Sequence, residues 1–407
     1  MNLTMDKTPV FSAVNPAGNM YPYLNKNIEC DVAIIGGGIA GALCAHRFAK
    51  AGVNCVLLSA DPLCQGSSSA SLGLLFYGAG KSFKELNDTF GFENAIMLYD
   101  ACLHAINEIE QLSKALGDPF SYERKDFLTL SASASNIKLF ETENFLRQNA
   151  GFDTQLIEYN SSDDEWSFDV TAGLLAKNLC AQVDPYRLVH ALVDDAVSAG
   201  LQVYENTAVE SITHDTAFSL KTTQHKTVNA NWVLMATGND ASQFLGNVTT
   251  VRTVFNVATN PLDNFKGYED KIILHHYDHD VYIRTTHDNR IVIGGLKCAA
   301  IDPQSNIAGV FPAPKIAGKR YQELEQIIRT MFFEIPNMHA EYCFASRAVD
   351  TRNHLPIIGE HKSYPGFLFT VCPAENGIVY SQIASRMLLD LYNGTKPQEL
   401  PFFAPQA

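Results

Sequence analysis

The stretch DVAIIGGGIAGALCAHRFAKAGVNCVLLSADP, residues 31–62, decides how the chain begins to fold. A run of β-branched residues leads into three glycines with GxGxxG spacing, Gly36, Gly38 and Gly41. Apolar residues then recur with the period of a helix, and a second buried run follows at 55–58. This order of strand, glycine turn, helix and strand predicts a βαβ unit that binds a dinucleotide.

The three glycines have separate purposes at such a site. The first permits the tight turn, the second lets the backbone approach a pyrophosphate, and the third lets helix and strand pack closely. The phosphates then meet the positive N-terminal end of the helix. The acidic residue that usually ends the second strand is absent, so we expect either Ser59, which takes that place, or Asp61 to bind the ribose.

Two stretches of small residues favour FAD over NAD as the cofactor. The run GSSSASLGLLFYG, residues 66–78, has backbone and hydroxyl groups that could line an extended cofactor. The run VLMATG, residues 233–238, ends a strand on small residues where the chain must pass close to a nucleotide.

Rossmann-like strand patterns recur far apart in the chain, which indicates a nucleotide domain built from several pieces. The predicted fold class is α/β with an α+β second domain: a Rossmann-like FAD-binding domain interleaved with an antiparallel-sheet substrate domain. Residues 120–180 of the substrate domain are expected to alternate between strands and turns. The predicted parts are an extended arm at 1–28, the FAD-binding domain at 29–80, 181–245 and 345–397, and the substrate domain at 81–180 and 246–344.

Composition and charge limit the kinds of partner. The chain has 407 residues and a formal net charge of −14 at pH 7, and no basic stripe offsets it, so we expect neither nucleic acid nor an anionic membrane as a partner. The first residues lack the pattern of a secretory signal, and no apolar run is long enough to span a bilayer. Nine scattered cysteines without a CxxC pair favour reduced thiols in the cytoplasm over disulfides or a zinc site.

The run HHYDHD, residues 275–280, superficially resembles a metal site. Its side chains alternate in direction along a strand or turn, so they would not all converge on one ion. We therefore expect a solvated loop here and no bound metal.

Several motifs follow one another in a known order. They are the glycine turn, GSSSAS (66–71), AQVDPYRLVHAL (181–192), MATG (235–238), YIRTTHDNRIVIGG (282–295), TRNHLPIIGE (351–360) and NGIVYSQIASRMLLDL (376–391). In this order the chain resembles the FAD-dependent oxidoreductases that include glycine oxidase, D-amino-acid oxidase and sarcosine oxidase. The resemblance covers about residues 28–395. It implies a two-domain fold, bound FAD, and oxidation of the carbon–nitrogen bond of an amine or amino acid by hydride transfer to the flavin.

The resemblance also implies which residues contact the cofactor. Gly36, Gly38 and Gly41 would form the pyrophosphate turn. Ser346 stands where a flavin-bonding cysteine is found in sarcosine-oxidase-like members, so non-covalent FAD is expected. The other residues expected at the cofactor are Ser68 and Ser69 alongside the flavin, Val209 at the adenine, Thr237 and Gly238 in an ATG element, and Gly359, Asn376, Gly377 and Ile378 at the flavin ring.

Four residues are candidates for contact with the substrate. Tyr282 and Arg284 share one face of a predicted strand, so a hydroxyl and a carboxylate-binding guanidinium would point together. Arg347 lies one residue from the place of the family's carboxylate-binding arginine. Glu375 could hold a substrate ammonium, which would favour an amine or polyamine over a simple amino acid. The alternatives are structural: salt bridges or loop contacts for the arginines, and a helix cap or a solvated side chain for Glu375.

The leading hypothesis is an FAD-dependent amine or amino-acid oxidoreductase that passes its electrons to dioxygen or to another acceptor. A flavin-binding protein without amine turnover, such as a sensor or an assembly subunit, is one alternative. A flavin monooxygenase is another. These patterns determine neither the substrate nor the oligomeric state.

Overall fold

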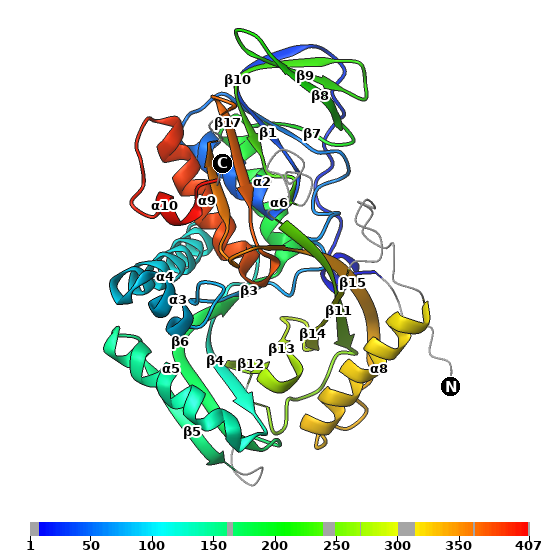
Figure 1. The fold of residues 1–407 in the computed structure, drawn as a ribbon. Coiled ribbons are helices and arrows are strands. Elements are labelled where there is room, and N and C mark those ends of the chain that lie inside the picture. The colour runs from blue at the N-terminus through cyan, green and yellow to red at the C-terminus, as the bar shows by residue number, and fades with distance from the viewer. Residues whose placement is uncertain are drawn as a thin grey trace.

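The computed structural model describes residues 8–160, 166–238, 249–268, 270–299, 314–360 and 363–405. These residues form two sheets, one above the other in Figure 1, with helices packed between and around them. This mixed architecture confirms the predicted fold class.

The first sheet has the strand order β16-β17-β10-β1-β2-β7, and β9 pairs with β10 and with β8. β1 is parallel to β2 and β10, β10 is parallel to β17, and β2 is parallel to β7. The carboxyl ends of these five strands therefore lie along one edge of the sheet. The strands are β1 (Ile28–Ile35), β2 (Cys55–Leu58), β7 (Gln202–Tyr204), β8 (Val209–His214), β9 (Phe218–Thr222), β10 (Thr227–Met235), β16 (Ile357–Glu360) and β17 (Phe367–Val371).

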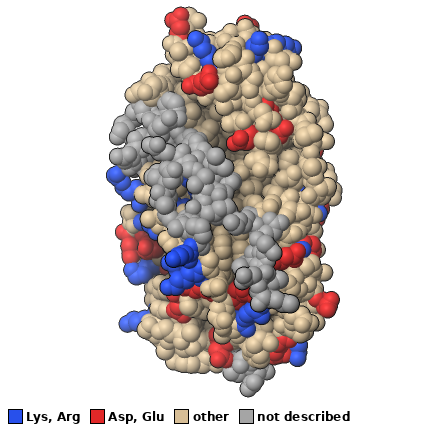
Figure 2. Space-filling model, turned by 90° about the vertical axis from the view of Figure 1, so that its right-hand side faces the viewer, with Lys and Arg blue, Asp and Glu red and all other residues tan. Residues whose placement is uncertain are grey.

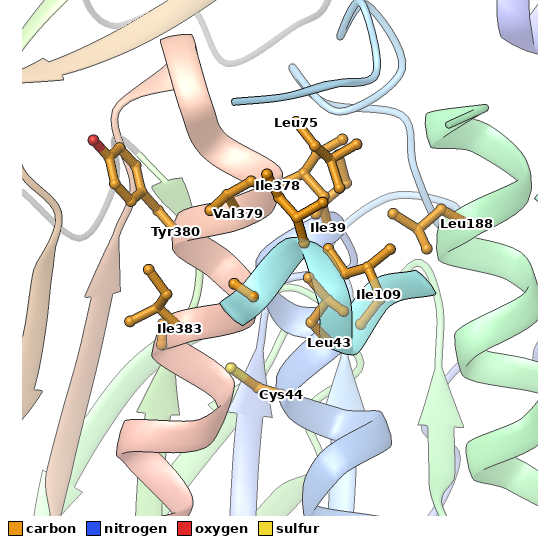
Figure 3. Packing of buried hydrophobic residues seen from close by; sticks show 14 of the residues in the cluster. Ile39, Leu43, Cys44, Leu75, Ile109, Leu188, Ile378, Val379, Tyr380 and Ile383 are labelled. Atoms are coloured by element: carbon orange, nitrogen blue, oxygen red, sulfur yellow. The ribbon is translucent and has the colours of Figure 1, made fainter. Parts of the chain in front are cut away.

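Helices bury one face of the first sheet. They are α2 (Ile39–Lys50), α4 (Phe92–Leu116), α6 (Pro185–Ser198) and α9 (Gly377–Tyr392). Figure 3 shows the core in which Ile39 of α2, Ile109 of α4 and Ile378 of α9 are all buried. Arg47 of α2 also donates from Nε to the Ser385 hydroxyl of α9 at 2.9 Å. These contacts fix α2 and α9 against each other.

The second sheet has the order β15-β11-β14-β13-β12-β4-β6-β3, with β5 paired to β6. α8 (Pro314–Met331) packs on β11 and β14, and α5 (Ile137–Asn149) packs on β5 and β6, as Figure 1 shows. The strands are β3 (Leu74–Leu75), β4 (Glu123–Ser131), β5 (Thr154–Asn160), β6 (Val170–Gln182), β11 (Thr249–Thr259), β12 (Ile272–His276), β13 (Val281–Thr285), β14 (Ile291–Ala299) and β15 (Ala340–Thr351).

The remaining helices are short or lie at junctions. α3 (Phe83–Phe90) begins with a capping box in which Ser82 and Glu85 satisfy each other's backbone N–H groups. The others are α1 (Val10–Val14), α10 (Leu400–Phe403) and the 3₁₀ turns η1 (Ala134–Asn136), η3 (Tyr277–His279) and η4 (Ala374–Asn376).

Three local expectations need correction. Residues 120–180 contain the 13-residue helix α5, not only strands and turns, and its weak amphipathic pattern explains why the sequence did not reveal it. The predicted antiparallel sheet has one parallel pair, β12 with β4, and the long stretch of chain between these strands permits it. The expected extended arm contains the helix α1, and its residues 1–7 lie outside the described part.

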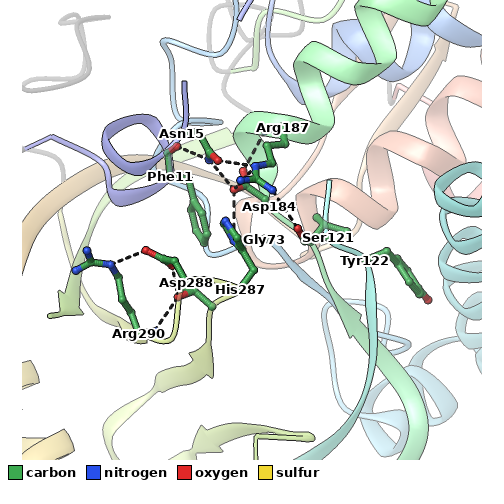
Figure 4. A network of polar contacts seen from close by, with 12 residues as sticks. Phe11, Asn15, Gly73, Ser121, Tyr122, Asp184, Arg187, His287, Asp288 and Arg290 are labelled. Carbon is green, nitrogen blue, oxygen red and sulfur yellow. Dashed lines mark hydrogen bonds and ion pairs between the residues drawn. The ribbon is translucent and has the colours of Figure 1, made fainter. Parts of the chain in front are cut away.

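Polar contacts hold this arm against the body of the protein. Asn15 donates to Asp184 at 2.6 Å, and Arg187 donates from Nε to the Asn15 side chain at 2.5 Å (Figure 4). Asp184 also caps α6 by accepting the backbone N–H of Arg187 at 3.0 Å. The arm is therefore an ordered element bound to the start of α6.

Charged residues of both signs are interspersed on the face shown in Figure 2, where the described residues form no continuous basic area. Within the described ranges, no helix is both long and apolar enough to cross a membrane.

Candidate active site at the junction of the two sheets

Two helices begin at the carboxyl edge of the first sheet. β1 passes through the glycine turn into α2, and β17 passes through η4 into α9. Because β1, β10 and β17 are parallel, the N-terminal ends of both helices lie at the same edge. Their partial positive charges can therefore act on one ligand there.

The glycine turn is too crowded for side chains. Gly36 has a φ of +123°, and a Cβ there would lie 2.4 Å from the carbonyl oxygen of Ala236. A Cβ at Gly41 would lie 1.8 Å from the carbonyl oxygen of Gly36. Gly38 caps α2, and the next N–H donates to the Ser68 hydroxyl at 3.0 Å. The turn thus brings its own backbone, the strand β10 and the serine run together.

Of the two alternatives for the ribose, the structure buries Ser59 and exposes Asp61. A Cβ at Gly37 would lie 2.3 Å from the Ser59 hydroxyl, so Ser59 stands beside the glycine turn. Sequence reasoning missed Glu205, whose buried carboxylate accepts the backbone N–H groups of Leu63 at 2.7 Å and Tyr21 at 2.8 Å. The sequence did offer one signal for Glu205, which is an acidic residue directly after the strand β7.

The segment after β10 lies against the same turn. A Cβ at Gly36 would be 3.3 Å from the backbone nitrogen of Thr237, whose buried hydroxyl has no hydrogen-bond partner among the described residues. Gly238 has a φ of +60°, and no described residue lies within 4 Å of the place where a Cβ would be. Val209 begins β8, and Ser69 is buried with its hydroxyl donating to the Gly66 carbonyl at 2.8 Å.

The start of α9 is tied to the segment after β3. The Asn376 side chain accepts the Phe76 N–H at 3.0 Å and donates to the carbonyls of Phe76 at 2.8 Å and Gly78 at 3.0 Å. No described residue lies within 4 Å of the place where a Cβ of Gly377 would be, and Ile378 is buried. The helix therefore begins beside open space.

Aromatic rings from the second sheet form one wall next to this end of α9. Tyr282 of β13 stacks on His275 of β12 with ring centroids 4.4 Å apart, and Phe76 packs on Tyr282 at 5.2 Å. Burial raises the pKa of Tyr282 well above its ordinary value, and Glu375 and Asp280 add to the effect. The phenol is therefore protonated over the physiological range and can donate a hydrogen bond.

An ion-pair cluster lies beside that wall, and sequence reasoning had identified only one of its members. Lys297 of β14 pairs with Glu375 of η4, and its Nζ lies 3.3 Å from Asp280 Oδ2. His275 Nε2 lies 3.8 Å from Asp280 Oδ1. Burial alone would lower the pKa of Lys297, but Glu375 and Asp280 outweigh it and raise the pKa above its ordinary value. Lys297 is therefore an ammonium.

A family model described as FAD dependent oxidoreductase matches residues 31–391. The chain belongs to this family. FAD is its cofactor.

Curated relatives and solved structures agree with this membership. The oxidoreductase is 23% identical to gamma-glutamylputrescine oxidoreductase of Escherichia coli over 91% of this chain and 85% of that protein. It is 27% identical to YhfW of Bacillus subtilis over 47% of this chain, a match that spans only 37% of YhfW. The structure of glycine oxidase from Geobacillus kaustophilus has a TM-score of 0.79 at 20% identity, covering 93% of this chain and 98% of that one.

The residues at the sheet edge of this oxidoreductase fit FAD. Gly36 and Gly41 leave room for backbone only. Among the described residues, the buried Thr237 hydroxyl has no partner and nothing lies within 4 Å of a Cβ placed on Gly238 or Gly377. Two helix N-termini oppose the negative charge of a pyrophosphate and of a reduced flavin. Gly359 has a φ of +144°, and a Cβ there would lie 3.1 Å from Pro405. A contact between Gly359 and FAD remains a prediction.

The predicted role of Arg284 needs correction. Its Nε donates to the Thr285 carbonyl, and its Nη1 donates to the carbonyls of Leu72, Gly73 and Val183 at 2.6 to 3.2 Å. The side chain is only 2% exposed, and the guanidinium lies 5.3 Å from the centre of the Phe11 ring. Arg284 therefore joins the second sheet to the segment after the serine run, and backbone carbonyls, not a substrate carboxylate, take the donors of its Nε and Nη1.

Arg347 lies in β15, where its Cα pairs with Thr253 of β11. β15 is separated from β13 and Tyr282 by β11 and β14, but it packs beside η4 and Glu375. A contact between Arg347 and the substrate remains a prediction.

The residues of the run HHYDHD differ in their exposure and in their contacts. Residues 277–280 are exposed, as expected of a solvated loop, but His275 and His276 are half-buried. Asp278 accepts hydrogen bonds from the Ser131 hydroxyl at 2.8 Å and from the Ala132 N–H at 2.8 Å. In the described part of the chain, no group of three or more such side chains could hold a metal ion.

Proposed function

We propose that this protein oxidises the carbon–nitrogen bond of an amine or amino acid at the junction of its two sheets. The observation that carries the proposal is that the glycine turn and the start of α9 share one sheet edge, directly beside Tyr282 and the Lys297–Glu375 pair. The family membership and the relatives of matching length support the same reaction class.

Bound FAD supplies the electron acceptor for this oxidation. Gly36, Gly38 and Gly41 hold its pyrophosphate, and the other contacts are made by the serine run, by the segment after β10 and by the start of α9. The residues assigned to these contacts are Ser59, Ser68, Ser69, Val209, Thr237, Gly238, Asn376, Gly377 and Ile378. Asn376 acts through its backbone, because its side chain is occupied by Phe76 and Gly78.

The side chains of the second sheet position the substrate. The rings of Tyr282, His275 and Phe76 give the carbon chain of the substrate an apolar wall. The Tyr282 hydroxyl donates a hydrogen bond, and Glu375 accepts one from the substrate nitrogen. Orientation of the substrate carbon is the main contribution that the chain makes to the rate.

The cysteines are reduced. None of the nine forms a disulfide and seven are buried, as expected of a protein that works in a reducing compartment such as the cytoplasm. Dioxygen or another acceptor then takes the electrons from the reduced enzyme.

Anaerobic mixing of the purified FAD-loaded protein with amines and amino acids tests the proposal. At least one class of amine is expected to bleach the flavin absorption band. A protein that retains FAD, and whose flavin no amine or amino acid reduces, would contradict amine oxidation and support a flavin-binding protein without turnover.

A further inference from the structure

The ion-pair cluster at the start of α9 contains two carboxylates and one ammonium. Lys297 is shared between Glu375 and Asp280, and His275 is the fourth member. The two carboxylates thus share the ammonium of Lys297, and Glu375, at 31% side-chain exposure, is more sheltered than Asp280 at 52%. A carboxylate that is partly removed from water is stabilised by a cation of its own.

The cluster is open to a ligand. Side-chain exposure is 25% for Lys297 and 31% for Glu375, compared with 2% for the buried residue Arg284. His275 Nε2 is buried and has no hydrogen-bond partner among the described residues, although it lies next to Asp280. A buried polar atom of this kind needs a partner, which a water molecule or a bound ligand can supply.

The members of the cluster come from both halves of the junction. Glu375 precedes the helix that begins at the cofactor edge, whereas Lys297 and Asp280 belong to the second sheet and its 3₁₀ turn. A ligand that contacts Glu375 therefore lies between the cofactor edge and the aromatic wall.

Resting on the function proposed above, we propose that the Asp280–Lys297–Glu375 cluster recognises the ammonium group of a cationic amine substrate. Lys297 neutralises Glu375 until the substrate enters. The substrate ammonium then pairs with Glu375, and Lys297 pairs with Asp280, from which it is already only 3.3 Å away. Each carboxylate then has its own cation.

The same two carboxylates disfavour a simple amino acid. A zwitterion brings a carboxylate together with its ammonium. Its carboxylate would lie within a few ångströms of Glu375 and Asp280, which repel it. The recognised class is therefore amines whose carboxylate is absent or distant from the nitrogen, including diamines.

Three isosteric probes that cannot be oxidised test this recognition apart from turnover. They are tert-butylammonium, 2-amino-2-methylpropanoate and pivalate, which lack a hydrogen on any carbon that bears nitrogen. Dissociation constants for the FAD-loaded protein come from calorimetry, with the shift in melting temperature as a second readout. We expect tert-butylammonium to bind about tenfold tighter than either of the other probes.

Variants separate recognition from a structural role. Glu375→Gln is expected to weaken tert-butylammonium binding about tenfold, whereas Lys297→Gln, which removes the competing cation, is expected to strengthen it about threefold or more. Lys266→Gln breaks an exposed pair with Glu334 elsewhere on the protein and serves as the matched control, with binding unchanged. A purely structural Lys297 would give weaker binding.

Two results would overturn the proposal: tighter binding of 2-amino-2-methylpropanoate than of tert-butylammonium, or weaker binding of tert-butylammonium by Lys297→Gln. Anaerobic bleaching separates this failure from that of the proposed function. If amines and amino acids reduce the flavin without the predicted charge preference, amine oxidation stands and the recognition mechanism falls.

Discussion

The two sides of the junction are built by different means. The edge of the first sheet is shaped by backbone atoms. Gly41 and Gly36 are in direct contact there, and no side chain larger than hydrogen fits. At the second sheet, side chains from β12, β13, β14 and η4 meet through ion pairs and ring stacking. The first arrangement is encoded within a few consecutive residues, and the second depends on how distant strands are paired.

Substitutions on the two sides of the junction should therefore affect different properties of the protein. Changes at the glycine turn should affect FAD binding and folding together, because backbone has no freedom to adjust. Changes in the cluster should alter substrate preference and leave the fold largely intact, because the side chains are half-exposed.

The largest effect is expected from Gly41→Ala. A Cβ only 1.8 Å from the Gly36 carbonyl oxygen forces the turn apart, at a cost of about 3 kcal/mol or more. We expect at least tenfold weaker FAD binding and a clear loss in the free energy of unfolding, measured by denaturant titration. Gly318→Ala in α8 has nothing within 4 Å and is the control, with equal or greater stability. A stable Gly41→Ala variant with normal FAD affinity would show that the glycine turn does not depend on a close backbone contact.

Arg284→Met is expected to come next. It leaves the carbonyls of Leu72, Gly73 and Val183 without a buried donor, so we expect a loss of about 2–3 kcal/mol in the free energy of unfolding. The relative kcat/KM for substrates with and without a carboxylate should not change. A stable variant that had selectively lost carboxylate substrates would instead restore the role first predicted from the sequence.

Arg284 also shows how far the sequence could lead. The period of the strand correctly put Arg284 and Tyr282 on one face, since both contact the segment 72–76. What the sequence could not show was that backbone carbonyls already occupy the guanidinium. The sequence analysis did not identify Lys297, because no local motif includes it. Its ion pair with Glu375 forms only where β14 packs beside η4.

The same reasoning applies to the fold. The βαβ unit and the helix after β17 were predictable, because their periods and glycines are local signals. The helix α5 was not, because its apolar residues do not form a strong stripe. The parallel pair β12 and β4 joins segments about 145 residues apart, which no local pattern encodes.

Tyr282→Phe tests whether a side chain of the second sheet acts on the substrate without contributing to stability. The ring contacts with His275 and Phe76 are kept, so the melting temperature should stay within about 2 °C. Loss of one hydrogen bond to the substrate should lower kcat/KM about fivefold. Tyr268→Phe provides the opposite control, because the Tyr268 hydroxyl donates to the Ile272 carbonyl inside the core. It should lower stability and spare kcat/KM.

The smallest effect is expected from His276, which lines a pocket away from the cofactor edge. Burial lowers its pKa to about 4, and His279 adds to the effect. Since the unfolded chain binds the proton more readily, stability is full above pH 6.5 and falls as the pH drops towards 4. His276→Gln should reduce this loss by about 1 kcal/mol, measured by denaturant titration at pH 7 and pH 4.5. Identical pH dependence in both proteins would contradict the assignment.

The central claim is that the glycine turn and the start of α9 hold the same FAD. The affinity of Gly377→Leu for FAD tests it most directly. Gly377 is helical and no described residue lies within 4 Å of its Cβ position, so the apoprotein should fold normally. The account predicts at least about tenfold weaker FAD binding with an unchanged melting temperature of the apoprotein. Unchanged FAD affinity in a normally folded variant would contradict the claim.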